Sequence, residues 1–161
     1  MNTYFKVAMV VVVAISSQAW AKSAVRAAKA AKTVSSDVTY ITRVTGVTNP
    51  PAGASLATVS PGGIITISPQ VKTGTVATAT TSIMTALGLI LTAANSDFDH
   101  VLGTVIYLTS LSDLPAVNTV YARSFTGGVP ARQVVQIPAL PGGAKVGISM
   151  VAMASSGGGV S

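Results

Sequence analysis

One uncharged helical segment constrains the fold of this chain more than any other feature of its sequence. In ATATTSIMTALGLILTAANS, residues 77–96, apolar side chains recur at intervals of three and four residues, the spacing that places them on one side of an α-helix. They are Ile83, Ala86, Leu87, Ile90, Leu91 and Ala94. The other side is threonine and serine without a charge, so the apolar stripe must be buried against a second layer. Asn95 is the expected C-terminal stop.

The segments around this helix have the residue content of β-strands. VTYITRV, LATVS and IITIS precede it (38–44, 56–60 and 64–68), and Gly62-Gly63 between the last two predicts a hairpin. Pro69 ends the third strand or places a bulge at its end.

Three more strands are predicted after the helix, in VLGTVIYLTS (101–110), VVQIPAL (134–140) and KVGISMVAMA (145–154). LSDLPAVNTVYARSF (111–125) predicts a second helix, capped by Ser112 or Asp113. Its expected inner face is Val117, Val120, Tyr121 and Phe125. The order β-β-β-α-β-α-β-β predicts a two-layer α+β domain over residues 38–154.

The first 21 residues have the three-part layout of a secretory signal peptide. MNTYFK with one lysine precedes nine apolar residues, VAMVVVVAI, and the small-x-small pattern Ala19-Trp20-Ala21 follows. The apolar run is shorter than the about 20 residues that a membrane-spanning helix needs. We expect cleavage after Ala21 and an exported protein, periplasmic or secreted; an uncut membrane anchor is the other interpretation.

Positive charge is concentrated directly after this leader. Residues 22–43 carry five basic side chains and one acidic one, a net charge of +4, whereas residues 44–161 carry four and three, a net charge of +1. The alanine-rich segment 22–37 is either a solvated linker or a basic helix in weak contact with an anionic envelope surface. The domain itself has too little excess charge to bind nucleic acid specifically. Residues 155–161 are expected to form a flexible tail.

The titratable residues leave few routes to catalysis. The chain has one histidine, His100, and neither cysteine nor glutamate, so we expect no metal site, and a Ser-His-Asp triad would depend on His100. No phosphate-binding glycine pattern opens either helix, and we expect no cofactor. Arg132 remains, because a guanidinium can hold a carboxylate bidentately. A surface arginine or an intersubunit salt bridge fits the same position.

A family resemblance covers the chain from about Pro50 to Ala154. The motif VN-x-x-Y, followed by PAR-x-x-x-x-x-x-x-LP, together with IITISPQV and ALGLILTAANSDFDHV, resembles the RidA (YjgF) family of reactive-intermediate deaminases, also labelled L-PSP endoribonucleases. The resemblance implies a chorismate-mutase-like fold, with a mixed sheet packed by two helices on one face. It also implies a homotrimer with clefts between subunits.

The resemblance assigns Arg132 to the substrate carboxylate and places Asn118, Ser68, Ser55 and Val134 in the same cleft. Three positions depart from the family pattern. Ser55 replaces a cleft tyrosine, Pro69 replaces the glycine of an SGQ motif, and Gly147 stands where active deaminases carry a glutamate that positions the attacking water.

Two functions therefore stay open for a cleft that binds small 2-oxo or 2-imino carboxylates. One is hydrolysis of 2-aminoacrylate-type enamines and imines to 2-oxo acids and ammonia. The other is a carboxylate-binding trimer without turnover. An endoribonuclease, suggested by the family's older label, lacks an obvious acid–base pair in this sequence.

Overall fold

A computed structural model describes residues 37–155 of the chain; the predicted signal peptide, most of the basic segment and most of the tail lie outside this range. The described chain forms a six-stranded sheet in the order β1-β2-β3-β6-β4-β5. Its strands are β1 Thr39–Ile41, β2 Ala57–Val59, β3 Ile64–Lys72, β4 Val101–Leu108, β5 Ala131–Gln136 and β6 Val146–Met153. β4 and β5 are parallel, and the other neighbouring pairs are antiparallel.

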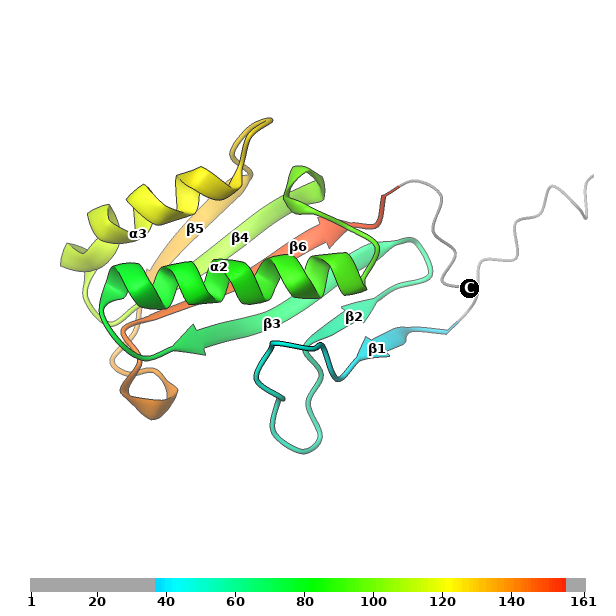
Figure 1. Cartoon of the computed structure of the whole chain (residues 1–161), viewed down its shortest axis with the longest axis horizontal. Coiled ribbons are helices and arrows are strands. Elements are labelled where there is room, and N and C mark those ends of the chain that lie inside the picture. The colour runs from blue at the N-terminus through cyan, green and yellow to red at the C-terminus, as the bar shows by residue number, and fades with distance from the viewer. Residues whose placement is uncertain (1–36, 156–161) are drawn as a thin grey trace, which may run out of the picture. The chain divides into compact units, whose positions relative to one another are not determined.

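Two α-helices of the described chain cover one face of this sheet (Figure 1). They are α2, Val76–Ala93, and α3, Leu114–Tyr121. Short 3₁₀ turns lie at Phe98–His100 (η1), Leu111–Asp113 (η2), Ala122–Ser124 (η3) and Pro141–Gly143 (η4). The predicted element order and the mixed α+β class are confirmed.

Hydrogen bonds close both ends of helix α2. The Thr75 hydroxyl oxygen accepts a hydrogen bond from the Thr78 amide at 3.3 Å. At the other end, Asn95 takes a left-handed conformation with φ 55°, and the amides of Asn95 and Ser96 return to the carbonyls of Thr92 and Leu91. This closing pattern satisfies the last free carbonyls of the helix, so the predicted stop at Asn95 is confirmed.

The core lies between α2 and the sheet. The helix contributes Ile83, Leu87, Ile90 and Leu91, each fully buried, and the strands contribute Ile65, Ile67, Ile106, Leu108, Ile148 and Met150. Among the described residues, α2 is long and apolar enough to cross a membrane, but half of it is buried inside the folded chain. Packing on the sheet therefore accounts for its hydrophobicity.

Four predicted elements differ from the structure at a boundary by three residues or more. β1 covers only 39–41 of the strand predicted at 38–44. β3 continues past Pro69 to Lys72, because Ser68 and Pro69 together oppose Ser149 in a β-bulge. The extra residue of a bulge is not paired with the neighbouring strand, so a proline there removes no hydrogen bond between strands. The second helix is shorter than residues 111–125, since 3₁₀ turns flank α3 and its Asp113 cap makes no side-chain hydrogen bond. The strand predicted at 134–140 runs instead over β5, 131–136.

No helix of residues 37–155 covers the second face of the sheet. Apolar side chains on this open face are partly exposed, at 37–47% for Ile64, Val135, Val151 and Met153. Ile64 pairs with Met153 across the β3–β6 ladder, and Val151 follows two residues before Met153 on the same face, so these three side chains form an apolar strip, whereas Val135 lies apart on β5. An uncovered strip of this kind is typical of a surface that meets another protein chain.

Candidate functional site

Arg132 lies on the edge strand β5, where side chains of α3 hold its guanidinium. Its Nη1 donates a hydrogen bond to Asn118 Oδ1 at 2.7 Å, and its Cζ lies 5.4 Å from the ring centroid of Tyr121. Arg132 is exposed, and no carboxylate of the described chain pairs with it. A guanidinium that is oriented by an amide and a ring, yet unpaired, is free to bind an anion.

A buried pair of hydroxyls fixes the ring beneath this guanidinium. Tyr121 and Thr104 are 1% and 4% exposed, and their hydroxyl oxygens lie 2.8 Å apart in a hydrogen bond. Burial raises the pKa of Tyr121, partly offset by the Thr104 hydrogen bond and the Arg132 charge. Thr104 on β4 is also paired with Arg132 on β5, so both side chains lie on the face of the sheet that the helices cover.

Ser55 and Ser68 form a second group on the other side of the sheet centre. The Ser68 hydroxyl donates to the Ser55 carbonyl at 2.8 Å, and the Gln70 side-chain amide donates to the Ser68 carbonyl at 3.0 Å. Two strands, β6 and β4, separate β3 from β5, which is three strand spacings or ~14 Å. Within one chain, these serines and Arg132 do not share a pocket.

Val134 and Gly147 lie on opposite faces of the sheet. Val134 pairs with Ile106 and packs half-buried against the core, on the same face as Arg132. Gly147 pairs with Tyr107 and Val71 on the open face. A Cβ built on Gly147 would lie 2.9 Å from Val71 Cγ1 and 3.4 Å from Leu140 Cδ2. In a single chain Gly147 is therefore covered and turned away from Arg132.

The predicted site residues thus fall into three places in one chain. The structure joins Arg132 to Asn118 and Ser68 to Ser55, but it does not join these pairs to each other or to Gly147. Sequence analysis missed Thr104 as a partner of Tyr121, and it assigned Tyr121 to the core alone. No sequence signal marks this contact, because it depends on the register of β4 against β5.

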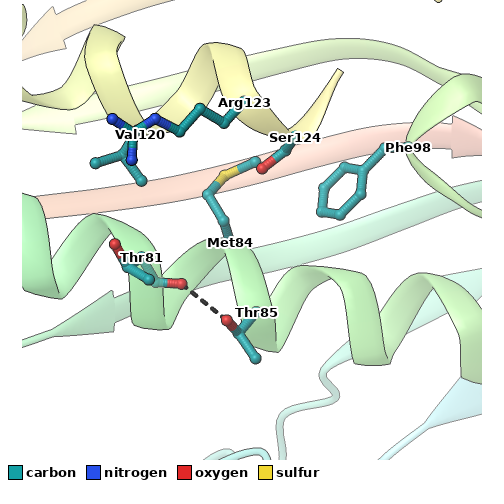
Figure 2. Close-up of a pocket in the computed structure, with 7 residues that line it drawn as sticks. All are labelled: Thr81, Met84, Thr85, Phe98, Val120, Arg123 and Ser124. Carbon is teal, nitrogen blue, oxygen red and sulfur yellow. Dashed lines mark hydrogen bonds between the residues drawn. The ribbon is translucent and has the colours of Figure 1, made fainter. Parts of the chain in front are cut away.

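A hollow lies elsewhere on the described chain, in a groove between α2 and α3. Its volume is about 260 Å³, and its side chains include Met84, Phe98 and Arg123 (Figure 2). Arg132 does not line it. No group of three or more histidine or acidic side chains gathers in residues 37–155 in a way that could hold a metal ion.

Comparisons with known proteins agree with the fold and with the motif. Residues 55–154 match the family model described as Endoribonuclease L-PSP. Protein DfrA of Myxococcus xanthus is 48% identical over 71 residues, which are 44% of this chain and 54% of that protein. The mouse 2-iminobutanoate/2-iminopropanoate deaminase is 42% identical over 67 residues, 42% of this chain and 50% of that protein.

The solved structures include a member of the YjgF protein family from Neisseria meningitidis. It is 29% identical, with a TM-score of 0.64, and the match covers 74% of this chain and 96% of that one. The chain spans about half the length of the curated relatives named above. Since the family model matches well over half of the sequence, and the fold agrees, this chain belongs to the RidA (YjgF, L-PSP) family.

Proposed function

We propose that this protein binds small 2-oxo and 2-imino carboxylates through Arg132, in a cleft between subunits, and hydrolyses enamines and imines of the 2-aminoacrylate type. The observation that carries the proposal is the oriented and unpaired guanidinium, held at 2.7 Å by Asn118 and placed over Tyr121. Membership in a family whose mouse member is named 2-iminobutanoate/2-iminopropanoate deaminase supports this substrate class.

The chemistry asks little of the protein beyond orientation. 2-Aminoacrylate tautomerises to 2-iminopropanoate, and water adds to the imine carbon to give a carbinolamine. A proton then moves from the added oxygen to nitrogen, and the C–N bond breaks to release ammonia and pyruvate. Arg132 would hold the carboxylate through these steps. Since such imines react with water unaided, positioning alone can accelerate the reaction. Gly147 supplies no carboxylate to position the attacking water, so we expect only a modest acceleration.

A second subunit would complete the cleft. Within one chain Ser55 and Ser68 lie ~14 Å from Arg132. They can therefore contact a ligand bound to Arg132 only if they come from a neighbouring chain. The apolar strip on the open face, including Val151 and Met153, supports association through that face. We therefore propose a homotrimer. Light scattering should give three times the chain mass at micromolar concentration, and a monomer mass would reject the assembly.

The deaminase proposal is tested by ammonia release from freshly generated iminopyruvate. Wild type should exceed buffer, and Arg132→Ala should lose most of the excess, because a charge-assisted pair contributes about 1.5–3 kcal/mol or roughly 10–150-fold. Arg43→Ala is the matched control, since Arg43 is an exposed arginine in a loop of the same domain. Release no faster than in buffer at stoichiometric protein would exclude catalysis.

Binding without turnover is the second function that the site supports. The specific observation is Gly147, which offers no carboxylate to orient water. Calorimetry with pyruvate and 2-oxobutyrate separates the two functions. Heat that disappears in Arg132→Ala, with no ammonia release by wild type, would establish a binding protein; no heat with any ligand would exclude it.

An endoribonuclease is a less favoured proposal. The family model carries that description, but the chain has a single histidine, His100, whose Nδ1 lies 2.7 Å from Asp97 Oδ1 at the start of a 3₁₀ turn. RNA cleavage that persists in both His100→Ala and Arg132→Ala would indicate a contaminant.

Export also remains a proposal, supported by the layout of residues 1–21. Intact-mass analysis of the secreted or periplasmic protein should place its first residue at Lys22. A chain that retains Met1 in the cytosolic fraction would contradict it. The basic segment 22–37 should add weak affinity for anionic vesicles, which a chain lacking it would lose.

A further inference from the structure

The groove between α2 and α3 has a preformed apolar wall. Phe98 meets Phe125 edge to face, with centroids 5.5 Å apart and rings at 77°. A Cβ on Gly88 of α2 would lie 3.2 Å from Phe98 Cε2, so glycine at this position lets the ring sit close to the helix. Met84, 4% exposed, supplies the adjoining floor. These contacts leave the wall little freedom to collapse into the groove.

Two donors at the rim of this groove have no protein partner. Arg123 is exposed and forms no hydrogen bond or ion pair with the described chain, and the Ser124 hydroxyl also lacks one. By contrast, the hydroxyls of Thr81 and Thr85 already donate to helix carbonyls, at 2.9 and 3.0 Å. Figure 2 shows the Arg123 side chain lying along α3 toward Val120, with Met84 reaching up toward Ser124.

The charge and the size of the groove select one kind of ligand. No carboxylate lines it, while a guanidinium and a hydroxyl are free to donate, so the complementary group is an anion. A volume of about 260 Å³ corresponds to roughly nine water molecules at about 30 Å³ each, which leaves room for a small organic anion. Aromatic and thioether side chains at its base favour a flat aromatic body.

We propose that this groove is a second binding site, for an aromatic monocarboxylate of about the size of benzoate. Its carboxylate pairs with Arg123 and Ser124, and its ring packs on Met84 and Phe98. The site lies on the helix layer, on the other side of α3 from the Asn118–Arg132 contact. It therefore stays open when the sheet face is covered by another subunit, and it does not depend on the function proposed for Arg132.

The test uses the full-length protein labelled with ¹³C in the methionine methyl groups. Benzoate should shift the Met84 methyl signal in a saturable way, while Met153 on the open sheet face serves as an internal control. The Met84 signal is assigned with Met84→Leu. Arg123→Gln should weaken the fitted affinity at least about tenfold, and benzamide, which has the same shape without the charge, should bind similarly weakly.

Arg132→Gln separates this site from the proposed deaminase cleft. The Met84 shift should persist in Arg132→Gln even if pyruvate binding is lost there. The proposal is overturned if benzoate leaves the Met84 methyl unshifted, if Arg123→Gln binds benzoate as well as wild type, or if Arg132→Gln abolishes the Met84 shift. Absence of pyruvate binding by wild type would contradict the function of Arg132 and leave the groove unaffected.

Discussion

The buried hydroxyl pair of Thr104 and Tyr121 permits a sharp test of what holds the Arg132 side of the domain. Both side chains are at most 4% exposed, and each hydroxyl has the other as its partner at 2.8 Å. Tyr121→Phe keeps the ring, with its contacts to Phe125 at 4.8 Å and to Arg132, but strands the Thr104 hydroxyl. Thr104→Val strands the tyrosine hydroxyl without changing the shape of β4.

The two single variants and the double variant should differ in a characteristic way. A buried hydroxyl left without a partner costs about 1–3 kcal/mol, whereas replacing both partners by apolar groups of the same shape is close to neutral. We expect each single variant to lose about 2 kcal/mol, and the double variant to lose less than about 1 kcal/mol. The coupling energy is then at least about 3 kcal/mol. At roughly 4 °C per kcal/mol, each single variant should melt about 8 °C lower.

The assay is urea unfolding at one fixed protein concentration, because association would make the apparent stability depend on concentration. Equal slopes of free energy against urea across the four proteins are required for the comparison. If the losses of the two single variants add in the double variant, the hydroxyls are not mutually dependent. The account of Tyr121 as a ring fixed by Thr104 would then be wrong.

Three further changes test other parts of the structure. Gly147→Glu should increase ammonia release only when it is combined with Val71→Ala. The new Cβ would lie 2.9 Å from Val71 Cγ1, and overpacking of this kind costs about 1–3 kcal/mol of stability. Equal activity of the single and combined variants would contradict this. Asn95→Gly should keep the melting temperature, and Asn95→Ala should lose about 1 kcal/mol, since residue 95 has φ 55°; equal melting of the two would refute the argument. The hydrogen bond from His100 lowers the pKa of Asp97 below its ordinary value of 3.8. The ionised Asp97 therefore stabilises the fold above pH 3.8. This contribution is lost as the pH falls through the lowered pKa. Asp97→Asn should therefore be less stable than wild type near neutral pH and converge with it in acid, and a difference that is constant with pH would exclude the linkage.

The sequence by itself determined the elements and their order. The 3.6-residue stripe from Ile83 to Ala94 defines α2, because an uncharged helix with one apolar side must be buried. Asn95 ends it, because few residues tolerate a left-handed backbone. Arg132 and Asn118 were also identified from the sequence, since the VN-x-x-Y and PAR motifs carry them, and the structure joins them at 2.7 Å.

The tertiary structure alone decided which side chains face each other. The parallel register of β4 and β5 sets Thr104 beside Arg132 and under Tyr121, and a slip of one residue would turn both away. The bulge at Ser68 and Pro69 lets a proline stand in a central strand. Within one chain, the alternation along β6 places Gly147 on the opposite face of the sheet from Arg132, so a cleft that holds both residues needs a second subunit. Strand periodicity gives each residue a face, but only the pairing of distant strands says what lies across from it.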